Sequence, residues 1–434
     1  MRGNYIEAVP LEPFHVLRQL DRLDLGENFL TNIPPIMFNG TLTVNDLNIE
    51  YNYLEKLEAS AFISLQPKRL YLSHNRISAI DPQAFNGVDR VLELVDLESN
   101  RLQNVSEAFS SLKKLRYLYL SHNNISTLPM EVFDTELCDT LRAMRMAHNN
   151  LQAFPSTVLR RCNRLSHLDL GYNRITSISD SEVRATCDHL DTLILRGNQI
   201  RTLDARLFKD CAKLREVSLS FNAIERIDSE AFRNVGDTLE SLEISFGLAM
   251  KSFPGRGLRP LVNLLWLAVD NNGLESISET DLYSLGELQY LNLESNKLKR
   301  LPKNLLHKNV HKKLLDVRLS YNGLKMIDSH TFSSLSTLQT VTMTGNFVKS
   351  IEMMAFHDLP NLKAVLVTQN HLTNVAPRAF SHLASLQRLE LQHNHLRTFT
   401  LAAFENCSSL LQHPMMLNLS FNNLEFLNPA PSAR

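Results

Sequence analysis

Apolar residues recur along this chain of 434 residues in one eleven-residue pattern, apolar-x-x-apolar-x-apolar-x-x-Asn-x-apolar. The first copy reads Leu20, Leu23, Leu25, Asn28 and Leu30. The pattern returns about every 24 residues to the end of the chain, a period typical of solenoids, in which each repeat packs only on its neighbours. We therefore predict one repeat array of about 17 rungs and no separate globular domains.

An asparagine closes the apolar pattern in nearly every copy. It stands at Asn28, Asn52, Asn75, Asn100, Asn123, Asn149, Asn173, Asn198, Asn222, Asn272, Asn296, Asn322, Asn346, Asn370, Asn394 and Asn422. Where a strand leaves a sheet inside a nearly dry core, backbone groups lose their partners, and a carboxamide supplies both donors and an acceptor. We interpret these asparagines as a structural ladder. Gly247 interrupts it, so we expect an irregular rung with a local change of curvature at 246–260.

Within each copy the apolar residues alternate, as in Leu168-Asp169-Leu170, which predicts a short strand with one buried and one exposed face. Parallel pairing of successive strands needs a return leg, and so short a repeat leaves no room for a long helix. The leg is expected to be extended or made of short turns. Its buried anchor stands ten residues after the asparagine, and the clearest cases are Phe14, Phe38, Phe62, Phe85, Phe133, Phe208, Phe232, Phe332, Phe356, Phe380 and Phe404.

The pattern, the period and the trailing Ala-Phe pairs, such as Ala61-Phe62 and Ala379-Phe380, resemble the extracellular typical class of leucine-rich repeat proteins. The resemblance implies an α/β-type solenoid, a horseshoe with a concave parallel sheet, and partner binding on that concave face. Within the class, the uninterrupted run is most similar to the chaoptin-like group, insect photoreceptor adhesion proteins that are lipid-anchored (GPI) at the cell surface. Slit-like and Toll-like arrays are usually interrupted or closed by cysteine-rich caps.

The array begins and ends within a repeat. We expect a partial repeat at 1–19, about 17 repeats over 20–427, and a tail at 428–434, and we interpret the chain as a segment of a longer protein. The sequence contains no stretch of about 18 apolar residues, so it predicts no membrane-spanning helix.

Charge and motifs favour a binding protein over an enzyme. Lys plus Arg total 45 against 46 for Asp plus Glu, which argues against a nucleic-acid partner. No nucleophile elbow, phosphate-binding loop or His-Glu-x-x-His pair is present. His74, His122 and His148 precede their asparagines and are interpreted as solvated turn residues; His122 and His148 alone would make a poor metal site. We expect no cofactor and no metal.

Four cysteines occupy equivalent places in consecutive repeats. Cys138, Cys162, Cys187 and Cys211 each replace a leucine found there in other copies, which suits a small buried thiol. Neighbouring rungs bring such residues within disulfide range, but ladder side chains point in parallel. We expect free buried thiols, with one or two rung-to-rung disulfides as the alternative and Cys407 as the unpaired residue.

Glycosylation sequons occur at Asn39, Asn104, Asn124, Asn406 and Asn418. Asparagine is so common here that about five matches would arise from composition alone. A glycan on Asn418, at the last strand, would block that rung as a contact surface.

The repeat geometry predicts which residues face outward on the sheet, namely those two, four and six places before each asparagine. Early rungs carry an acidic run, Asp24, Asp46, Glu50, Asp96 and Glu98, tempered by Arg22 and Arg69. The candidate contact residues are Tyr71, Tyr117, Tyr119, Trp266 and Tyr290, because tyrosine and tryptophan dominate binding energy at interfaces. The alternative is that these aromatic rings only pave the sheet by cross-strand packing.

Three functions follow as hypotheses. The first is cell–cell adhesion, possibly homophilic, by an array that binds a similar array on an opposing cell. The second is the ligand-binding ectodomain of a Toll-like or other receptor. The third, an enzyme or an intracellular inhibitor scaffold, is disfavoured by the missing catalytic groups and by the longer repeats, near 28 residues, of the inhibitor class. The lack of internal caps favours adhesion.

Overall fold

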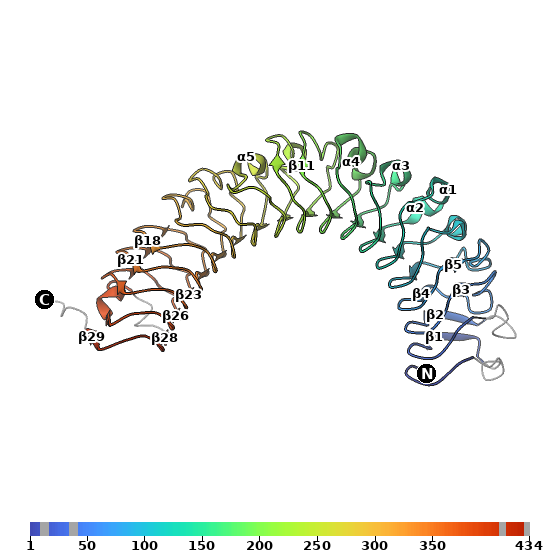
Figure 1. Cartoon of the computed structure of the whole chain (residues 1–434), viewed down its shortest axis with the longest axis horizontal. Helices are drawn as coiled ribbons and strands as arrows, with labels where there is room; N and C mark the ends of the chain where they lie inside the picture. Colours follow the sequence, from blue (N-terminus) through green and yellow to red (C-terminus); the bar gives the residue numbers. More distant parts are fainter. Residues whose placement is uncertain (9–16, 34–41, 408–413, 429–434) are drawn as a thin grey trace. The chain divides into compact units, whose positions relative to one another are not determined.

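A computed structural model describes residues 1–8, 17–33, 42–407 and 414–428. The chain winds as a solenoid, in which each turn contributes one strand to a parallel sheet and returns through a loop (Figure 1). It divides into two compact units. Unit 1 comprises Met1–Ile200 and Leu207–Glu216, and unit 2 comprises Arg201–Arg206 and Val217–Arg434.

In unit 1 the sheet strands lie on the inner side of the turns and the return legs on the outer side (Figure 1). The sheet strands are β1 (Gln19–Asp24), β2 (Thr43–Asn48), β4 (Arg69–Tyr71), β6 (Leu94–Asp96), β7 (Tyr117–Tyr119), β8 (Ala143–Arg145), β9 (His167–Asp169) and β10 (Thr192–Ile194). The return legs contain β3 (Lys56–Leu57), β5 (Ala79–Ile80), the 3-10 helix η2 (Glu107–Ser111), α1 (Met130–Phe133), α2 (Leu137–Thr140), α3 (Ser156–Leu159) and α4 (Asp180–Cys187).

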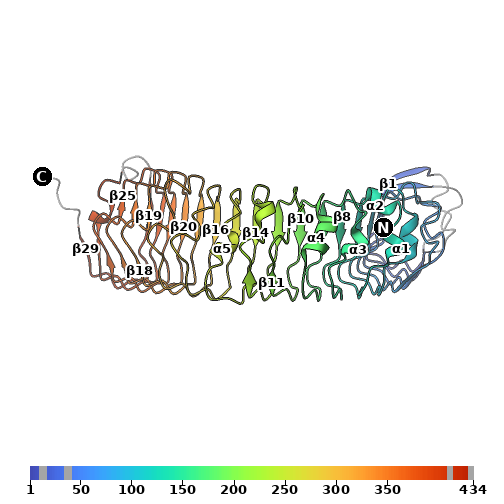
Figure 2. The same ribbon diagram turned by 90° about the horizontal axis from the view of Figure 1, so that it is seen from above.

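Unit 2 repeats this arrangement, and its turns stack in sequence order (Figure 2). Its sheet strands are β12 (Glu216–Ser218), β14 (Ser241–Glu243), β15 (Trp266–Ala268), β16 (Tyr290–Asn292), β17 (Asp316–Arg318), β20 (Thr340–Thr342), β23 (Ala364–Leu366), β26 (Arg388–Glu390) and β28 (Met416–Asn418). Its return legs contain β11 (Thr202–Leu203), β13 (Arg226–Ile227), η3 (Arg233–Val235), α5 (Gly255–Leu258), β18 (Met326–Ile327), β19 (Phe332–Ser333), β21 (Ser350–Ile351), β22 (Phe356–His357), β24 (Asn374–Val375), β25 (Phe380–Ser381), β27 (Thr398–Thr400), η4 (Leu401–Phe404) and β29 (Phe426–Asn428).

The predicted fold class is confirmed, since the sheet has 17 parallel strands and the protein has little helix. Strand register follows the alternation of apolar residues. On β15 and β16, for example, buried Leu267 pairs with buried Leu291, and half-buried Trp266 pairs with half-buried Tyr290 on the outer-facing side of the sheet. A slip of one residue would turn the apolar set out of the core, so the register is strongly specified.

The return legs are extended or made of short turns, as predicted, except where helices occur, most of them in unit 1. The longest of these is α4, whose eight residues begin at a capping box: the backbone N–H and the hydroxyl of Ser179 both donate to the carboxylate of Glu182 at 2.8 Å. Within residues 1–8, 17–33, 42–407 and 414–428, no helix combines the length and the apolar character needed to cross a bilayer.

Each asparagine side chain joins its own turn to the turn before it. The Oδ1 of Asn346 accepts from the backbone N–H groups of Asn322 and Leu324, both at 3.2 Å. Its Nδ2 donates to the carbonyls of Leu319 and Met343, both at 3.0 Å. Most of the asparagines are buried, but Asn222, Asn272 and Asn422 are half-buried.

The rung at Gly247 keeps its strand without an asparagine. The Oδ1 of Asn272, one turn later, accepts from the N–H groups of both Gly247 and Leu248 at 2.8 Å, and its Nδ2 donates to Ile244. A Cβ at position 247 would lie 2.9 Å from the carbonyl oxygen of Leu219, so the close approach of the backbone requires glycine here.

Buried phenylalanines stack behind the sheet in both units. In unit 2 the ring centroids of Phe332 and Phe356 are 5.1 Å apart, those of Phe356 and Phe380 are 5.3 Å apart, and Phe404 follows at 5.7 Å. Phe109, nine residues after its asparagine, extends the series in unit 1 at 5.3 Å from Phe85. Phe14 and Phe38 lie outside the described residues.

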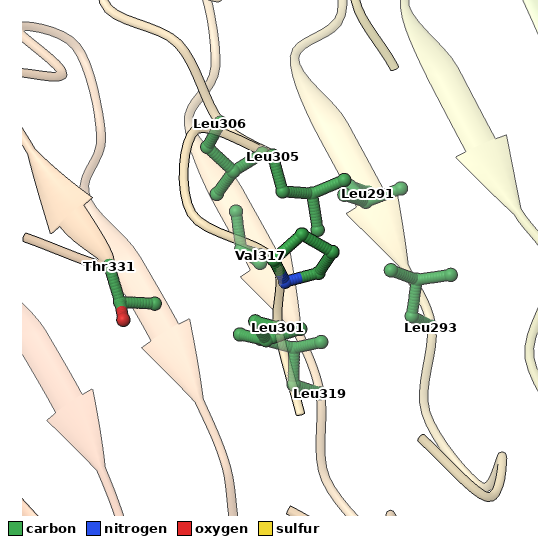
Figure 3. A pocket seen from close by; sticks show the side chains of 9 residues that line it. Leu291, Leu293, Leu301, Leu305, Leu306, Val317, Leu319 and Thr331 are labelled. Carbon is green, nitrogen blue, oxygen red and sulfur yellow. The ribbon is translucent and has the colours of Figure 1, made fainter. Parts of the chain in front are cut away.

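A small cavity of about 10 Å³ lies in one turn of unit 2 (Figure 3). Leu306 stands at the phenylalanine place, and Figure 3 shows it above Val317 and near Leu305. The cavity is lined by apolar side chains and by Thr331, whose hydroxyl donates to the carbonyl of Asp328 at 2.8 Å, so we assign it to imperfect packing.

The cysteines correct the sequence-based expectation of free thiols. Cys138 is bonded to Cys162 and Cys187 to Cys211, with Cα–Cα distances of 4.1 and 4.7 Å. In each pair one cysteine lies in a helix, Cys138 in α2 and Cys187 in α4, and its partner lies in a loop. The two side chains of each pair therefore do not point in parallel. The prediction of free thiols was wrong because it assumed that they do. Cys407 is buried and forms no disulfide with another described cysteine, as expected, and its thiol donates to the carbonyl of Leu383 at 3.3 Å.

Asn346→Asp is expected to destabilise unit 2 by about 3 kcal/mol or more, because a carboxylate cannot donate and would face carbonyl oxygens in a buried site. Amide hydrogen exchange should accelerate in β17, β20 and β23, the strands around this turn. Asn309→Asp, at an exposed position, is the matched control. Equal protection in both variants would contradict a structural role for the ladder.

Alkylation of the denatured protein without reductant is expected to modify one cysteine, Cys407, and prior reduction should expose all five. Intact mass and peptide mapping would count and locate the modified thiols. Modification of five cysteines without reductant would restore the free-thiol interpretation.

Candidate protein-binding surface

The sheet has one face that points away from the core. This face carries the residues two, four and six places before each asparagine, which were predicted to face outward. The residue four places before each asparagine forms one continuous row in unit 1, because the register pairs Asn48 with Tyr71, Tyr71 with Asp96, and Asp96 with Tyr119. Arg145 on β8 continues the row. Sequence spacing alone thus placed these side chains on one surface.

Three of the candidate tyrosines lie in this row or beside it. Tyr71, Tyr117 and Tyr119 are half-buried, and the rings of Tyr117 and Tyr119 meet edge to face with centroids 6.5 Å apart. The guanidinium of Arg145 lies over the Tyr119 ring, 4.5 Å from its centroid. This cation–π contact was not predicted, because it depends on the direction of two long side chains.

Asp96 is the most perturbed carboxyl group on this surface. Burial raises the pKa of Asp96 to about 6 from an ordinary value of 3.8, and the negative charges of Glu98 and Glu50 add to the rise. The Glu98 N–H, which donates to Oδ1 at 2.9 Å, and the more distant Arg145 oppose it. Throughout the described ranges, no cationic side chain lies within ion-pair distance of Asp96.

The hydrogen bond of Asp96 has a structural role that other rungs fill with asparagine or aspartate. The side chain four places before the ladder asparagine accepts from the N–H two residues later in Asp96, Asp24 and Asp169, and equally in Asn48, Asn292 and Asn418. A neutral amide therefore suffices for this local turn. The negative charge at position 96 has no such structural explanation.

In unit 2 the candidate residues Trp266 and Tyr290 contact each other on neighbouring strands, with ring centroids 5.0 Å apart and planes inclined by 38°. Next to them, Asp270 accepts from Ser245, Asn271 and Asn292, which satisfies its carboxylate with neutral donors. The Trp266 indole N–H is buried without an acceptor in the part of the chain that the structure describes. The pair fits both a contact site and cross-strand paving.

The sequence analysis missed a second row of rings, formed by the residues directly before the asparagines. These residues adopt a left-handed backbone, with φ between 50° and 57° where they are not glycine. Their side chains stack from turn to turn: His122 and His148 at 4.1 Å, and His148 and Tyr172 at 4.3 Å. Gly197 and Gly345 at this position, where positive φ favours glycine, were the available sequence signal.

The stacked histidines do not make a metal site. His122 and His148 face each other plane to plane, and across the described residues no group of three potential ligands gathers. Burial, with help from His122 and Arg196, lowers the pKa of His148.

The sequons differ in accessibility. Asn104, Asn124 and Asn406 are exposed, whereas Asn418 is half-buried and its Nδ2 donates to Glu390 at 3.0 Å. Asn39 lies outside the described residues. Of the described sequons, Asn418 is thus the one whose acceptor nitrogen is already engaged.

A family model described as "Leucine rich repeat" matches residues 18–67, 68–125, 188–245, 312–372 and 360–424, more than half of the chain. The chain belongs to the leucine-rich repeat family. Leucine-rich repeat proteins bind proteins, which agrees with the chemically varied surface of this sheet face.

Curated relatives match parts of this leucine-rich repeat chain. Lumican of Gallus gallus is 30% identical over 180 residues, which are 41% of this chain and 50% of lumican. Chaoptin of Drosophila melanogaster is 28% identical over 162 residues, which are 37% of this chain and 10% of chaoptin. The match thus spans half of lumican and a tenth of chaoptin. The general resemblance is confirmed, and the narrower one to chaoptin is carried into the proposal below.

Solved structures share the fold. Toll in its complex with Spatzle superposes with a TM-score of 0.64 and 21% identity, over 90% of this chain and 49% of that one. A leucine-rich repeat protein of Leptospira interrogans gives 0.62 and 21%, over 88% and 92%. At this identity the likeness extends to the fold alone. The two disulfides and the leucine-rich repeat relatives indicate an extracellular protein.

Asp96→Asn is expected to stabilise the protein at pH 7.5 by about 1–2 kcal/mol, because it keeps the hydrogen bond from Glu98 and removes a half-buried charge. Since the folded pKa is raised, the wild-type carboxyl is protonated first in the folded state as pH falls from about 6 to 3.8. The wild type therefore gains stability across this window, and the advantage of the variant disappears below it.

Thermal unfolding of both proteins at pH 7.5 and pH 4 would measure this difference. Asp316→Asn is the matched control, because Asp316 is paired with Arg318 at 2.9 Å and should show no gain at pH 7.5. A lower midpoint for Asp96→Asn than for wild type at pH 7.5 would refute the assignment.

Proposed function

We propose that this chain mediates cell–cell adhesion at the cell surface by binding a protein partner, such as a second copy on an opposing cell, through the outward face of its parallel sheet. The observation that supports this most is the uncovered sheet face itself. Parallel sheets usually have both faces covered, whereas here one face presents half-buried tyrosine, tryptophan and carboxylate side chains to solvent.

The partial similarity to chaoptin supports adhesion over the alternative, a ligand-binding receptor ectodomain. Both functions use the same surface and differ in whether the partner is displayed on another cell. The adhesion proposal includes a lipid anchor at the cell surface, and the similarity to chaoptin is the only support for that anchor.

Display of the chain on cells that do not otherwise cluster is expected to cause clustering of expressing cells with one another. Failure to cluster, with surface display verified by antibody, would contradict homophilic adhesion and favour a receptor for a separate ligand.

The double change Trp266→Ser with Tyr290→Ser is expected to reduce clustering without loss of the fold, because it removes two half-buried aromatic rings that contact each other on this face of unit 2. Tyr283→Ser is the control, since Tyr283 is 57% exposed and lies on a return leg. Thermal unfolding would verify that each variant is folded. Unchanged clustering of the double variant would show that the pair only paves the sheet.

A further inference from the structure

One row of the sheet face in unit 1 places a carboxylate between two aromatic rings. Tyr71, Asp96 and Tyr119 occupy equivalent positions on β4, β6 and β7 and are directly paired in register. All three are half-buried, so each remains reachable from solvent. Tyr71 and Tyr119 are two strands apart, about 10 Å, and a cation above Asp96 would be about 5 Å from each ring. That distance lies within the reach of a cation–π contact.

We propose that Tyr71, Asp96 and Tyr119 form a slot that binds one arginine side chain of a protein partner. The inference rests on the proposed function, because it names the chemistry that the binding surface of unit 1 recognises. The carboxylate and the rings together match a guanidinium, because a guanidinium forms an ion pair with a carboxylate and stacks on aromatic rings.

The charge of Asp96 lacks a counterpart within the described protein. The nearby Arg69 is already paired with Asp46, and Arg116 lies 3.5 Å from Glu93. Elsewhere on the same face, the buried carboxylate of Glu390 is held by Arg388 at 2.6 Å and by Asn418. A half-buried carboxylate without such a partner reduces stability and is favoured where a bound cation completes the site.

The protein itself shows that Tyr119 accepts a guanidinium. Arg145 lies over this ring from β8, the strand on the other side of Tyr119 from Asp96. A similar contact occurs in the first turns, where Arg76 lies over Tyr53 at 4.5 Å. A partner arginine above Asp96 would add a second guanidinium on the β6 side. Arginine suits the slot better than lysine because it is planar and less strongly hydrated.

The surroundings are complementary to a basic segment. The charged and titratable groups around Asp96 are Asp46 and Glu50 on β2 or just beyond it, Arg69 and Tyr71 on β4, Glu98 after β6, Tyr117 and Tyr119 on β7, and Arg145 on β8. Of the arginines, Arg69 is paired with Asp46 and Arg145 stacks on Tyr119. Glu50 lies 3.7 Å from Arg2, whereas Glu98 has the same sign as Asp96 and would strengthen attraction of a cation.

The test is a titration of the whole chain with the peptide acetyl-Gly-Arg-Gly-amide, observed through the ring signals of 13C-labelled tyrosine. Tyr71→Phe and Tyr119→Phe assign two of the ten tyrosines and, because they keep the rings, should retain binding. We expect saturable shifts at Tyr71 and Tyr119 at pH 7.5 and low salt, and none with the citrulline peptide, which lacks the charge.

Asp96→Asn should weaken arginine-peptide binding by about fivefold or more while the protein stays folded. Asp316→Asn should leave it unchanged. Lowering the pH from 7.5 to 5 should weaken binding to the wild type, because protonation of Asp96 removes the charge, and should change little in Asp96→Asn. Equal binding by wild type and Asp96→Asn would overturn the proposal. Equal binding of a lysine peptide would overturn the assignment to arginine.

The slot and the adhesion function can fail separately. If cells displaying the wild type cluster but no arginine peptide shifts Tyr71 or Tyr119, the slot is refuted and adhesion stands. If the peptide binds in an Asp96-dependent way but cells do not cluster, the slot stands and homophilic adhesion is refuted.

Discussion

The rest of the structure depends on the asparagine carboxamide that joins each turn to the turn before it. A repeat of this length cannot enclose its own core, so each interface between neighbouring turns must satisfy its own backbone groups. One asparagine side chain satisfies these groups. Its oxygen accepts from backbone N–H groups of the previous turn, and its nitrogen donates to one carbonyl in its own turn and to one in the previous turn. Where Gly247 breaks the series, Asn272 supplies two acceptor contacts to the gap, and the sheet continues.

This constraint also explains why the fold was predictable and some of its surface was not. Seventeen strands, their parallel register and the phenylalanine stack follow from a period repeated over the whole chain. The left-handed backbone before each asparagine leaves little trace in the sequence, because histidine, tyrosine, serine and phenylalanine all occupy the position. The bond energy of the ladder offsets the cost of that conformation, so glycine is not required. The stacked rings at that edge therefore emerged only from the structure.

The disulfides show the limit of reasoning from the period alone. Equivalent residues on neighbouring strands do point in parallel, as Trp266 and Tyr290 illustrate on the sheet face. The return legs are less uniform, since α2 and α4 each contain one cysteine whose partner lies in a loop of the next turn. Periodicity predicted the Cα proximity of the paired cysteines correctly, but side-chain direction depends on local secondary structure, which varies from one return leg to the next.

The sequence predicted where the candidate site lies, but it did not predict the burial of Asp96 or the pairing of the charged groups around it. Spacing from the asparagines put Tyr71, Asp96 and Tyr119 on one surface, but only the structure shows that Asp96 is half-buried and that nearby arginines are engaged elsewhere. The same hydrogen bond is made without a charge at Asn48 and Asn292, and with a carboxylate at Asp24 and Asp169. A solenoid distributes its stability over many similar interfaces, so one rung can carry an unfavourable charge without loss of the fold. A neutral asparagine would make the same hydrogen bond at position 96, so the half-buried carboxylate there agrees with the proposed arginine slot.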